Sequence, residues 1–480
     1  MQTKASLLCL LLAMVATGCG YHGQTPRAQA PESFSVDTTA NPVKNLPDHP
    51  WWQEMGSREL DRLVLEALEN NQQISIAAKN IEIAQSVLET VRLGWLPSVN
   101  LMAGRFNSDG VVLLQNLPVP LAGSGNIFAF LPTWVANIIQ LPNQTKSAEK
   151  KVDATAADYL TLRTTIAAQV VTSYALLLAS IEQERLLVAL QENLRTQFST
   201  TESMRARGLQ NQIAVIEQDS DLQQLLGQLA LNRSNQIAAK NALLTLLGRP
   251  LASFTPQNKF ADLNLDVITP GNTPTSVLAT RPDVVAARAK IDAADYGISA
   301  TASLFAPDLM LSAASVRATG NAAGESFSAQ ETVEIGLLSV ALDPQFIGKI
   351  STANKQYDAA VLNYLKVVDQ AIKEADNALA DFEARRTALT KAEKALANQK
   401  TNLATYRAMV HNGLLAQTQY LQNLTELDLA TIAIIQSKLQ AVNSLATLYQ
   451  SMGAGATFGQ DQYRLADQSI GDSNRDDTKN

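Results

Sequence analysis

The sequence is short of the residues on which most metal sites and many catalytic sites depend. It has three histidines and two cysteines among 480 residues, and His22, His49 and His411 lie far apart along the chain. A zinc site or a Cys–His nucleophile needs such residues in a cluster. The sequence therefore predicts neither a metal centre nor cysteine-based catalysis, and we expect no enzyme.

Charge is also scarce. Charged residues make up 17% of the chain, whereas about 25% is usual for a soluble domain. The formal net charge of −7 argues against nucleic acid as a partner, because phosphate binding needs an excess of lysine and arginine. What is present is apolar: 46% of the residues are hydrophobic, which is enough for a large buried core.

The N-terminus has the pattern of an export signal. Lys4 precedes an apolar run from Ala5 to Val15, and small residues then lead to Cys19. This pattern predicts a lipoprotein signal peptide over residues 1–18, with N-acyl diacylglycerol on Cys19 as the only covalent group and no other cofactor. Ordinary export with a chance cysteine is the alternative. Gly20 stands where an aspartate would favour the inner membrane, so we expect a lipid-anchored protein of the outer membrane of a Gram-negative bacterium.

After the signal, no uninterrupted apolar run of about 18 residues occurs, so we expect no membrane-spanning helix. Any crossing must then use β-strands in a closed barrel. Alternating apolar and polar residues indicate four strands, at Ser98–Arg105, Asn126–Trp134, Asp308–Val316 and Thr332–Leu342. The uncharged stretch Gly110–Thr145 is rich in proline and glycine, so we expect strand and loop there rather than helix. Buried soluble β-structure is the alternative. Asp308 and Glu334 are candidates for side chains that face a lumen and tune selectivity.

The chain contains an internal repeat. Trp95–Leu101, around Pro97, aligns with Phe305–Leu311, around Pro307, and Gly208 aligns with Gly413. Each half is predicted to contain a helix, two strands, a long helix, a tight turn and another helix. The predicted segments are a signal peptide at 1–18, a lipidated segment at 19–56, a first repeat at 57–260, a second repeat at 261–455 and a polar, disordered tail at 456–480.

The helices have coiled-coil periodicity. Apolar residues recur at alternating steps of four and three from Tyr357 to Phe382, and again from Ile435 to Tyr449, which is typical of a helix seam packed on a neighbour. Gln345–Val410 lacks proline and would reach about 100 Å as one helix. Gly208 and Gly413 are the expected reversal points, because glycine readily ends a helix in the left-handed region.

These patterns predict a mainly α fold with a small β part. Four strands cannot close a membrane barrel, since small bacterial barrels have about eight strands. Three copies would supply about 12 strands, and the same threefold axis would arrange the long helices as a hollow cylinder. We therefore predict a homotrimer in which a 12-stranded outer membrane β-barrel continues into a long periplasmic α-helical coiled-coil barrel.

Four stretches resemble one family, the TolC/OprM-type outer membrane factors of tripartite drug efflux systems. They are similar to its opening helix, to the Arg-Pro-Asp motif of its second repeat, to its two helix-turn tips and to the end of its first repeat. In this sequence they are Trp51–Asn71, Thr280-Arg281-Pro282-Asp283, the tips at Arg205–Leu209 and His411–Leu414, and Leu246-Leu247-Gly248. We interpret the Arg-Pro-Asp motif as structural, with the proline early in a helix and the carboxylate in its first turn.

The resemblance implies a passive trimeric duct that docks a periplasmic adaptor and an inner-membrane transporter and is opened by them. It implies adaptor-docking tips at Arg205, Arg207, Gly208, Leu209, Gly413 and Leu414. It places the periplasmic aperture at Ala214, Gln419 and Gln422. The family often has aspartates there, but none of these three residues is acidic, so we expect glutamine hydrogen bonds and packing to hold the constriction. A lipid-anchored coiled-coil scaffold or adhesin is the alternative function, and it would need no β-strands.

Overall fold

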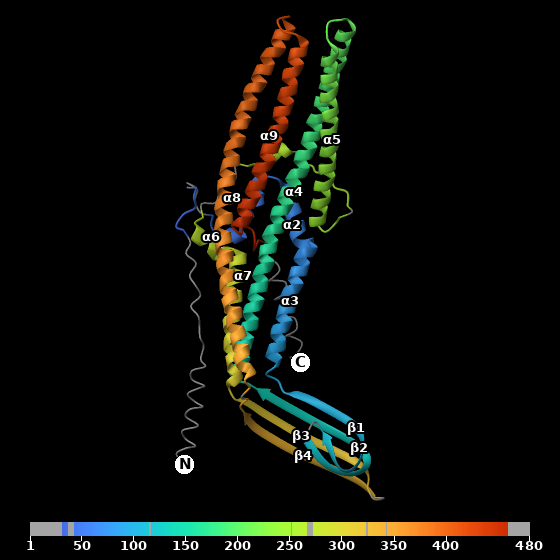
Figure 1. Ribbon diagram of the computed structural model, residues 1–480, viewed down its shortest axis with the longest axis vertical. Helices are drawn as coiled ribbons and strands as arrows, with labels where there is room; N and C mark the ends of the chain where they lie inside the picture. Colours follow the sequence, from blue (N-terminus) through green and yellow to red (C-terminus); the bar gives the residue numbers. More distant parts are fainter. Residues whose placement is uncertain are drawn as a thin grey trace, which may run out of the picture. The chain divides into compact units, whose positions relative to one another are not determined.

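The computed structural model describes residues 31–36, 43–114, 117–250, 252–265, 272–322, 325–341 and 343–458. It is mainly helical with one small antiparallel sheet (Figure 1), as the sequence predicts. The described elements, in chain order, are η1 (Leu46–Asp48), η2 (Trp51–Met55), α2 (Arg58–Asn70), α3 (Gln72–Leu93), β1 (Ser98–Leu114), β2 (Leu117–Ala136), α4 (Gln140–Ala206), α5 (Gln212–Leu246), η3 (Phe260–Asp262), α6 (Pro274–Thr280), α7 (Pro282–Ala302), η4 (Ser303–Phe305), β3 (Asp308–Ala322), β4 (Glu325–Ser339), α8 (Gln345–His411) and α9 (Gln417–Ser451).

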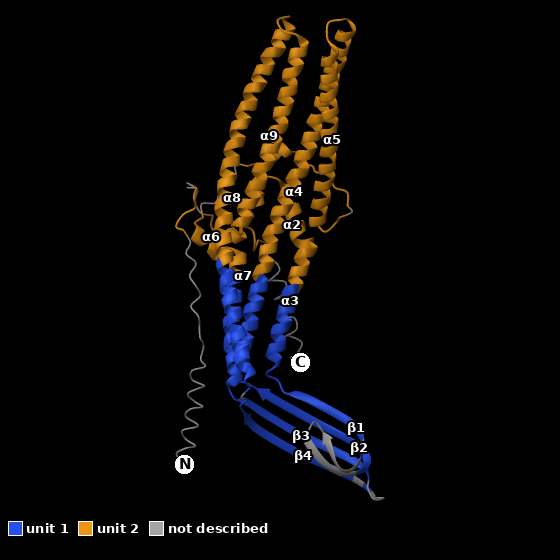
Figure 2. Ribbon diagram, in the orientation of Figure 1, with its two compact units in different colours: residues 1–27, 80–156, 286–365 blue, residues 28–79, 157–285, 366–480 orange. Residues whose placement is uncertain are grey.

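The chain forms two compact units (Figure 2). Unit 1 comprises described residues within 80–156 and 286–365, and unit 2 comprises described residues within 28–79, 157–285 and 366–480. Unit 1 contains the whole sheet, whereas unit 2 contains both tight turns between long helices. Each half of the sequence contributes to both units.

The sheet has the strand order β1-β2-β3-β4, with every neighbouring pair antiparallel. All four strands fall where period-two alternation predicts them, and each extends beyond its predicted span at the hairpin end. β4 begins there at Glu325 and ends at Ser339, before the predicted end at Leu342. The structure therefore confirms the four predicted strands, and its two hairpins are longer than the sequence pattern predicted.

The pairing register places two predicted lumen residues on opposite faces of the sheet. Asp308 pairs with Ser339, and Glu334 pairs with Ala313. Because Asp308 and Ala313 are five residues apart on one strand, their side chains point to opposite faces. Asp308 and Glu334 therefore cannot both line the same lumen, which corrects the expectation that treated them together.

The two halves contain helices of matching length. α4 and α8 each have 67 residues, and α5 and α9 each have 35. α8 confirms the predicted rod and ends one residue later than expected, at His411. Most of the predicted seam is buried, as coiled-coil packing requires: Val368, Ala371, Ala375, Ala378 and Phe382 in α8, and Ile435, Val442, Ala446 and Tyr449 in α9. Val361, Tyr364 and Leu439 of the seam are half-buried.

The prediction that residues 110–145 exclude helix was wrong at their end. α4 begins at Gln140, and the Asn137 side chain accepts hydrogen bonds from the backbone N–H groups of Ile139 and Gln140, at 3.1 and 2.8 Å. Pro142 then lies in the first turn, where a helix tolerates proline because the missing N–H has no intrahelical partner. With Asn137 capping its first N–H groups, the helix can therefore begin at Gln140 although Pro142 follows.

The core of unit 2 joins the beginning and the end of the described chain. Trp51 is fully buried and stacks on Tyr449, with ring centroids 5.1 Å apart and planes 8° apart. Gly455 packs on Trp52 so closely that a Cβ there would lie 2.7 Å from the indole. The Gly455 N–H donates to the carbonyl of Leu46 at 3.3 Å. This bond joins the segment that follows α9 to the segment that precedes α2.

One described helix, α4, is long and apolar enough to cross a membrane by length and composition, but 67% of its apolar window is buried inside the protein. Packing accounts for that apolar character, because core helices have the same composition. The predicted signal peptide, Cys19 and residues 459–480 of the predicted tail lie outside the described residues.

Candidate functional site: the helix-turn tips

Both long helices of unit 2 end in the same turn. Gly208 has φ +73° and Gly413 has φ +69°. After α4, the N–H of Leu209 donates to the Met204 carbonyl at 2.9 Å; after α8, the N–H of Leu414 donates to the Met409 carbonyl at 2.8 Å. This six-to-one hydrogen bond with a left-handed glycine is the Schellman motif. The predicted reversal points are therefore confirmed as glycine C-caps.

The tips expose apolar and basic side chains. Leu209 and Leu414, each just after its glycine, are 69% and 71% exposed. Arg205 and Arg207 are also exposed, and Arg205 Nη1 donates to Gln212 Oε1 at 3.2 Å across the first turn. Each tip thus holds an exposed leucine on a rigid turn, and the first tip adds two exposed arginines.

The return helices begin differently. The Asn211 side chain caps α5 by accepting from the N–H of Ala214 at 2.8 Å, whereas Ala416 begins α9 without a side-chain cap. Ala214 is half-buried, and Gln419 and Gln422 are exposed on the first turns of α9. Within the described chain, the side chains of Gln419 and Gln422 make no hydrogen bond, so the expected glutamine hydrogen bonds do not form within one copy.

A polar clasp near the tips was not predicted. Gln197 Nε2, on α4, donates to Thr425 Oγ1 at 2.9 Å and to the Leu421 carbonyl at 3.2 Å, both on α9. Asn193 Nδ2 donates to the same threonine oxygen at 3.3 Å. We call Asn193, Gln197 and Thr425 the α4–α9 clasp. Gln197 is only 7% exposed, so these bonds lie largely out of water and join the two helix hairpins three residues from Gln422.

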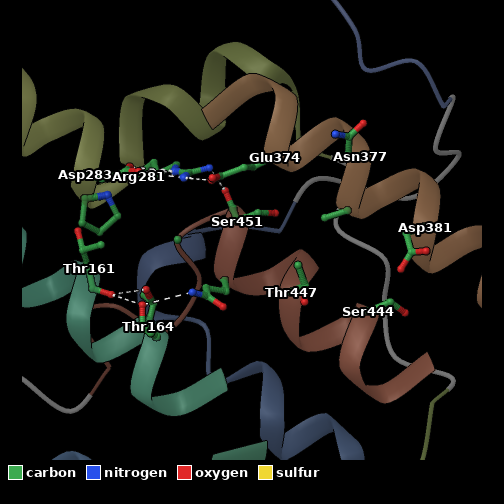
Figure 3. A pocket seen from close by; sticks show the side chains of 15 residues that line it. Thr161, Thr164, Arg281, Asp283, Glu374, Asn377, Asp381, Ser444, Thr447 and Ser451 are labelled. Carbon is green, nitrogen blue, oxygen red and sulfur yellow. Dashed lines mark hydrogen bonds and ion pairs between the residues drawn. The ribbon is translucent and has the colours of Figure 1, made fainter. Parts of the chain in front are cut away.

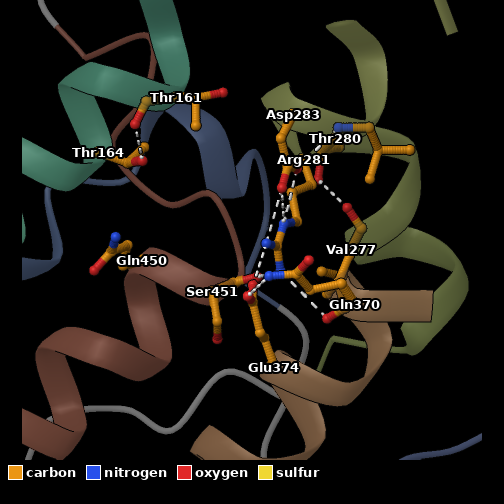
Figure 4. A network of polar contacts seen from close by, with 12 residues as sticks. Thr161, Thr164, Val277, Thr280, Arg281, Asp283, Gln370, Glu374, Gln450 and Ser451 are labelled. Atoms are coloured by element: carbon orange, nitrogen blue, oxygen red, sulfur yellow. Dashed lines mark hydrogen bonds and ion pairs between the residues drawn. The ribbon is translucent and has the colours of Figure 1, made fainter. Parts of the chain in front are cut away.

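The Arg-Pro-Asp motif has the structural role expected from the sequence. Pro282 is the first residue of α7, and Asp283 Oδ1 accepts from the Val284 N–H at 2.8 Å in its first turn. Arg281 is buried and forms the centre of a network (Figure 4). Its Nη1 donates to the carbonyls of Ser451 and Ala371, at 2.8 and 3.2 Å, and its Nε and Nη2 donate to Asp283.

Glu374 completes this network by accepting from Arg281 Nη2. Burial would raise the pKa of Glu374, but hydrogen bonds from Arg281 and Gln370 outweigh burial and hold that pKa below its ordinary value. Burial likewise opposes the charge of Arg281, and its bonds to Asp283 and Glu374 raise the pKa of the guanidinium instead. The arginine is thus a fixed cation that binds the end of α9 to α7 and α8.

A cavity of about 470 Å³ lies beside this network (Figure 3). Hydroxyl, amide and carboxylate groups from α4, α8 and α9 line it, among them Thr161, Thr164, Asn377, Asp381, Ser444 and Thr447. No group of His, Cys, Asp or Glu in the described part of the chain could hold a metal ion. The polar lining suits water, and its one arginine is already bound on several sides.

The two rigid turns present exposed leucines, and a small number of hydrogen bonds hold the hairpins together behind them. Hydrogen bonds of this kind each contribute about 1 kcal/mol, so the clasp stabilises this packing of the hairpins only modestly.

Comparison with known proteins agrees with this geometry. The family model "Outer membrane efflux protein" matches residues 63–249 and 273–454. The pyoverdine export outer membrane protein OpmQ of Pseudomonas putida is 28% identical over 63% of this chain and 66% of its own length. The outer membrane protein OprJ of Pseudomonas aeruginosa is 24% identical over 93% of this chain and 95% of its own.

The fold is also that of a solved channel. The open-state outer membrane channel MtrE of Neisseria gonorrhoeae superposes with a TM-score of 0.75 at 20% identity, covering 91% of this chain and 98% of its own. The family match covers both halves of the sequence and includes all four strands and both tips. This chain therefore belongs to the outer membrane efflux protein family, a family of Gram-negative outer membrane channels that extend through the periplasm.

Proposed function

We propose that three copies of the chain form the outer membrane duct of a tripartite efflux pump, which conducts drugs or other small toxic compounds from the periplasm to the exterior without chemistry of its own. The observation that carries this proposal is the four-stranded sheet, in which β1 and β4 are edge strands. A membrane-spanning sheet must close, since lipid cannot satisfy an open edge. Pairing β4 of one copy with β1 of the next would close a barrel of about 12 strands.

The matched helices support a second part of the proposal, that the chain is an internal duplication. Helices of 67 and 35 residues occur once in each half. At about 1.5 Å per residue the longer ones reach about 100 Å, which suits a tube across the periplasm. Three copies with two hairpins each would surround the threefold axis with alternating, near-equivalent hairpins.

The tips are the proposed contact with a periplasmic adaptor, which in turn joins an inner-membrane transporter. Leu209 and Leu414 would be the apolar contacts, with Arg205 and Arg207 beside the first. Ala214, Gln419 and Gln422 would narrow the resting aperture, and adaptor binding would open it by separating the hairpins. We also propose that acyl chains on Cys19 anchor the protein in outer membrane lipid.

Recording from planar bilayers tests the duct directly. The purified protein should give discrete conductance steps, and a low-resolution image of the same particles should show a hollow threefold cylinder. A lipid-anchored scaffold or adhesin would give neither. The anchor needs its own test: Cys19→Ser should abolish palmitate incorporation, and labelling that persists would disprove it.

A further inference from the structure

The hydroxyl groups that line the cavity beside Arg281 offer it only acceptors (Figure 3). Each donates its proton to a backbone carbonyl of its own helix, three or four residues earlier, at 2.8–3.1 Å. These groups belong to Thr161, Thr164, Thr165, Ser444, Thr447 and Ser451. A hydroxyl has one proton and two lone pairs, so the lone pairs are what remains for an occupant.

The side-chain donors at this cavity are also mostly bound. All five N–H groups of Arg281 have acceptors, because Nε and Nη2 donate to Asp283 and Glu374 and Nη1 donates to two backbone carbonyls. Gln450 Nε2 donates to Thr165 Oγ1 at 3.2 Å. Among the lining side chains, the exposed amide of Asn377 is the donor group without a bond inside the described chain. The lining is therefore rich in acceptors.

The buried acceptors cannot turn to bulk water. Thr164, Ser444 and Ser451 are 5–6% exposed, and within the described chain their hydroxyl oxygens accept no hydrogen bond. A buried acceptor without a partner is unfavourable. The cavity of about 470 Å³ thus favours an occupant that donates several hydrogen bonds.

The cavity has an excess of negative charge as well. Three carboxylates line it, those of Asp283, Glu374 and Asp381, against the single guanidinium of Arg281. Outside the lining, Arg385 Nε pairs with Asp381 at 2.7 Å, which leaves one negative charge uncompensated. Lys373 also acts on Glu374, but Lys373 is exposed, so solvent screens its charge. Water would satisfy the acceptors but not this charge.

We propose that the cavity binds a primary alkylammonium cation, a small organic amine whose NH3 group donates to the lining oxygens. Such a group combines three N–H donors with one positive charge, as the Lys side chain does, and hydrogen bonds from a cation are about twice as strong as neutral ones. Ala378 and Pro282 of the lining can contact a short alkyl chain. The site goes beyond the proposed duct and does not depend on it.

Calorimetric titration of the purified full chain in detergent with n-butylammonium chloride tests the site. We expect saturable binding of one cation per chain. Tetramethylammonium carries the same charge without an N–H donor, and butyrate carries a similar chain with acceptors in place of donors, so neither should bind. Equal binding of tetramethylammonium would overturn the role of the acceptors, and tighter binding of butyrate would overturn the role of the charge.

Removing two acceptors should weaken binding. Ser444→Ala with Thr447→Val removes two cavity oxygens and should lower the affinity for n-butylammonium by at least about tenfold, because bonds from a charged donor are strong. Thr431→Val with Ser437→Ala is the matched control on the same helix. Those hydroxyls also donate only to carbonyls of α9, at 2.8 and 3.0 Å, and do not line the cavity. Equal affinities of the two double variants would overturn the site.

Removing the neighbouring cation should have the opposite effect. Arg385→Gln frees the Asp381 carboxylate and adds one net negative charge beside the cavity. The Arg385 and Asp381 side chains are 38% and 47% exposed, so the affinity should rise by only about two- to threefold. Weaker binding in this variant would overturn the charge argument. Absence of any saturable heat in the wild type would overturn the proposal, while conductance in bilayers would still report on the duct separately.

Discussion

Asn71 and Arg281 bind equivalent carbonyl groups in the two halves of unit 2. Asn71 Nδ2 donates to Leu246 at 2.9 Å, and Arg281 Nη1 donates to Ser451 at 2.8 Å. Each donor follows the end of a helix, α2 or α6, and each acceptor is the last residue of a 35-residue helix. An amide suffices in the first half. In the second half the Arg281 guanidinium also binds α8 and α7, so Arg281 connects more helices than Asn71 does.

Replacing Arg281 should therefore destabilise unit 2. Arg281→Gln removes the donors of the Ala371 carbonyl and of two carboxylates, and losing one partner of a buried ionic network costs about 2–4 kcal/mol. Thermal unfolding in detergent, followed by circular dichroism, measures the loss. Arg185→Gln is the matched control, because the Arg185 side chain is 65% exposed in its pair with Glu182 and should change stability by less than about 0.5 kcal/mol. Equal effects of the two variants would contradict a central role for Arg281.

The Arg281–Glu374 contact should weaken in acid. The pKa of Glu374 in the folded protein lies below its ordinary value of 4.5, so the ionised carboxylate contributes stability above that value. This contribution is lost as pH falls through the lowered pKa. Because the Glu374 side chain is 40% exposed, the effect should stay below about 1 kcal/mol. Glu374→Gln should be less stable than wild type at pH 7, and the difference should shrink as pH falls below 4.5 through the lowered pKa; a gap that widens in acid would refute the sign.

Loosening the α4–α9 clasp should favour the open duct. Thr425→Val keeps the shape of the side chain and removes the oxygen that accepts from Gln197 and Asn193. Leaving the buried Asn193 amide without its acceptor, and Gln197 with only the Leu421 carbonyl, costs this packed state about 1–3 kcal/mol. We expect longer or larger openings in bilayer recordings. Thr401→Val is the control, since the Thr401 hydroxyl bonds only to the Ala397 carbonyl of its own helix, and it should leave gating unchanged.

The tip glycines should tolerate alanine poorly for conformational reasons alone. A Cβ added at Gly413 would meet no atom within 4 Å, so the cost of Gly413→Ala is the left-handed backbone, about 1 kcal/mol. Amide exchange at the end of α8 should accelerate about fivefold. Gly227→Ala, equally free of contacts but inside α5, should slow exchange, because alanine stabilises a helix interior by about 0.5–1 kcal/mol. The same sign at both sites would contradict this account.

The proposed aperture residues can be tested independently of the α4–α9 clasp. Gln419→Ala with Gln422→Ala should raise resting conductance and sensitise cells to large antibiotics, because it removes the side chains proposed to narrow the mouth. Gln210→Ala, on the exposed turn after α4, should do neither. No change in conductance for the double variant would place the constriction elsewhere.

Local patterns in the sequence predicted much of this molecule. Period-two alternation located the four strands, helical periodicity located α8 and its buried seam, and Gly208 and Gly413 marked the helix ends, because each signal depends on neighbouring residues. Contacts between distant residues have no such signal. The bond from Gln197 to Thr425 joins positions 228 residues apart, and Arg281 reaches Ser451 across 170. The helix start at Gln140 was not predicted, because Pro142 and the other prolines of this stretch argued against helix and the capping role of Asn137 was not recognised.

The interlocking of Gly455 with Trp52 has a consequence for biogenesis. Arg163 Nη2, on α4, donates to the Phe458 carbonyl at 2.7 Å, and the Thr457 N–H donates to the Pro47 carbonyl at 2.9 Å. The indole pocket around Trp52 is thus completed by residues that leave the ribosome some four hundred positions after it. A chain in the course of export must keep both tryptophans exposed until those residues arrive, so periplasmic chaperones have a long interval in which to bind it, and truncation at the C-terminal side should yield a chain that is degraded before it can assemble.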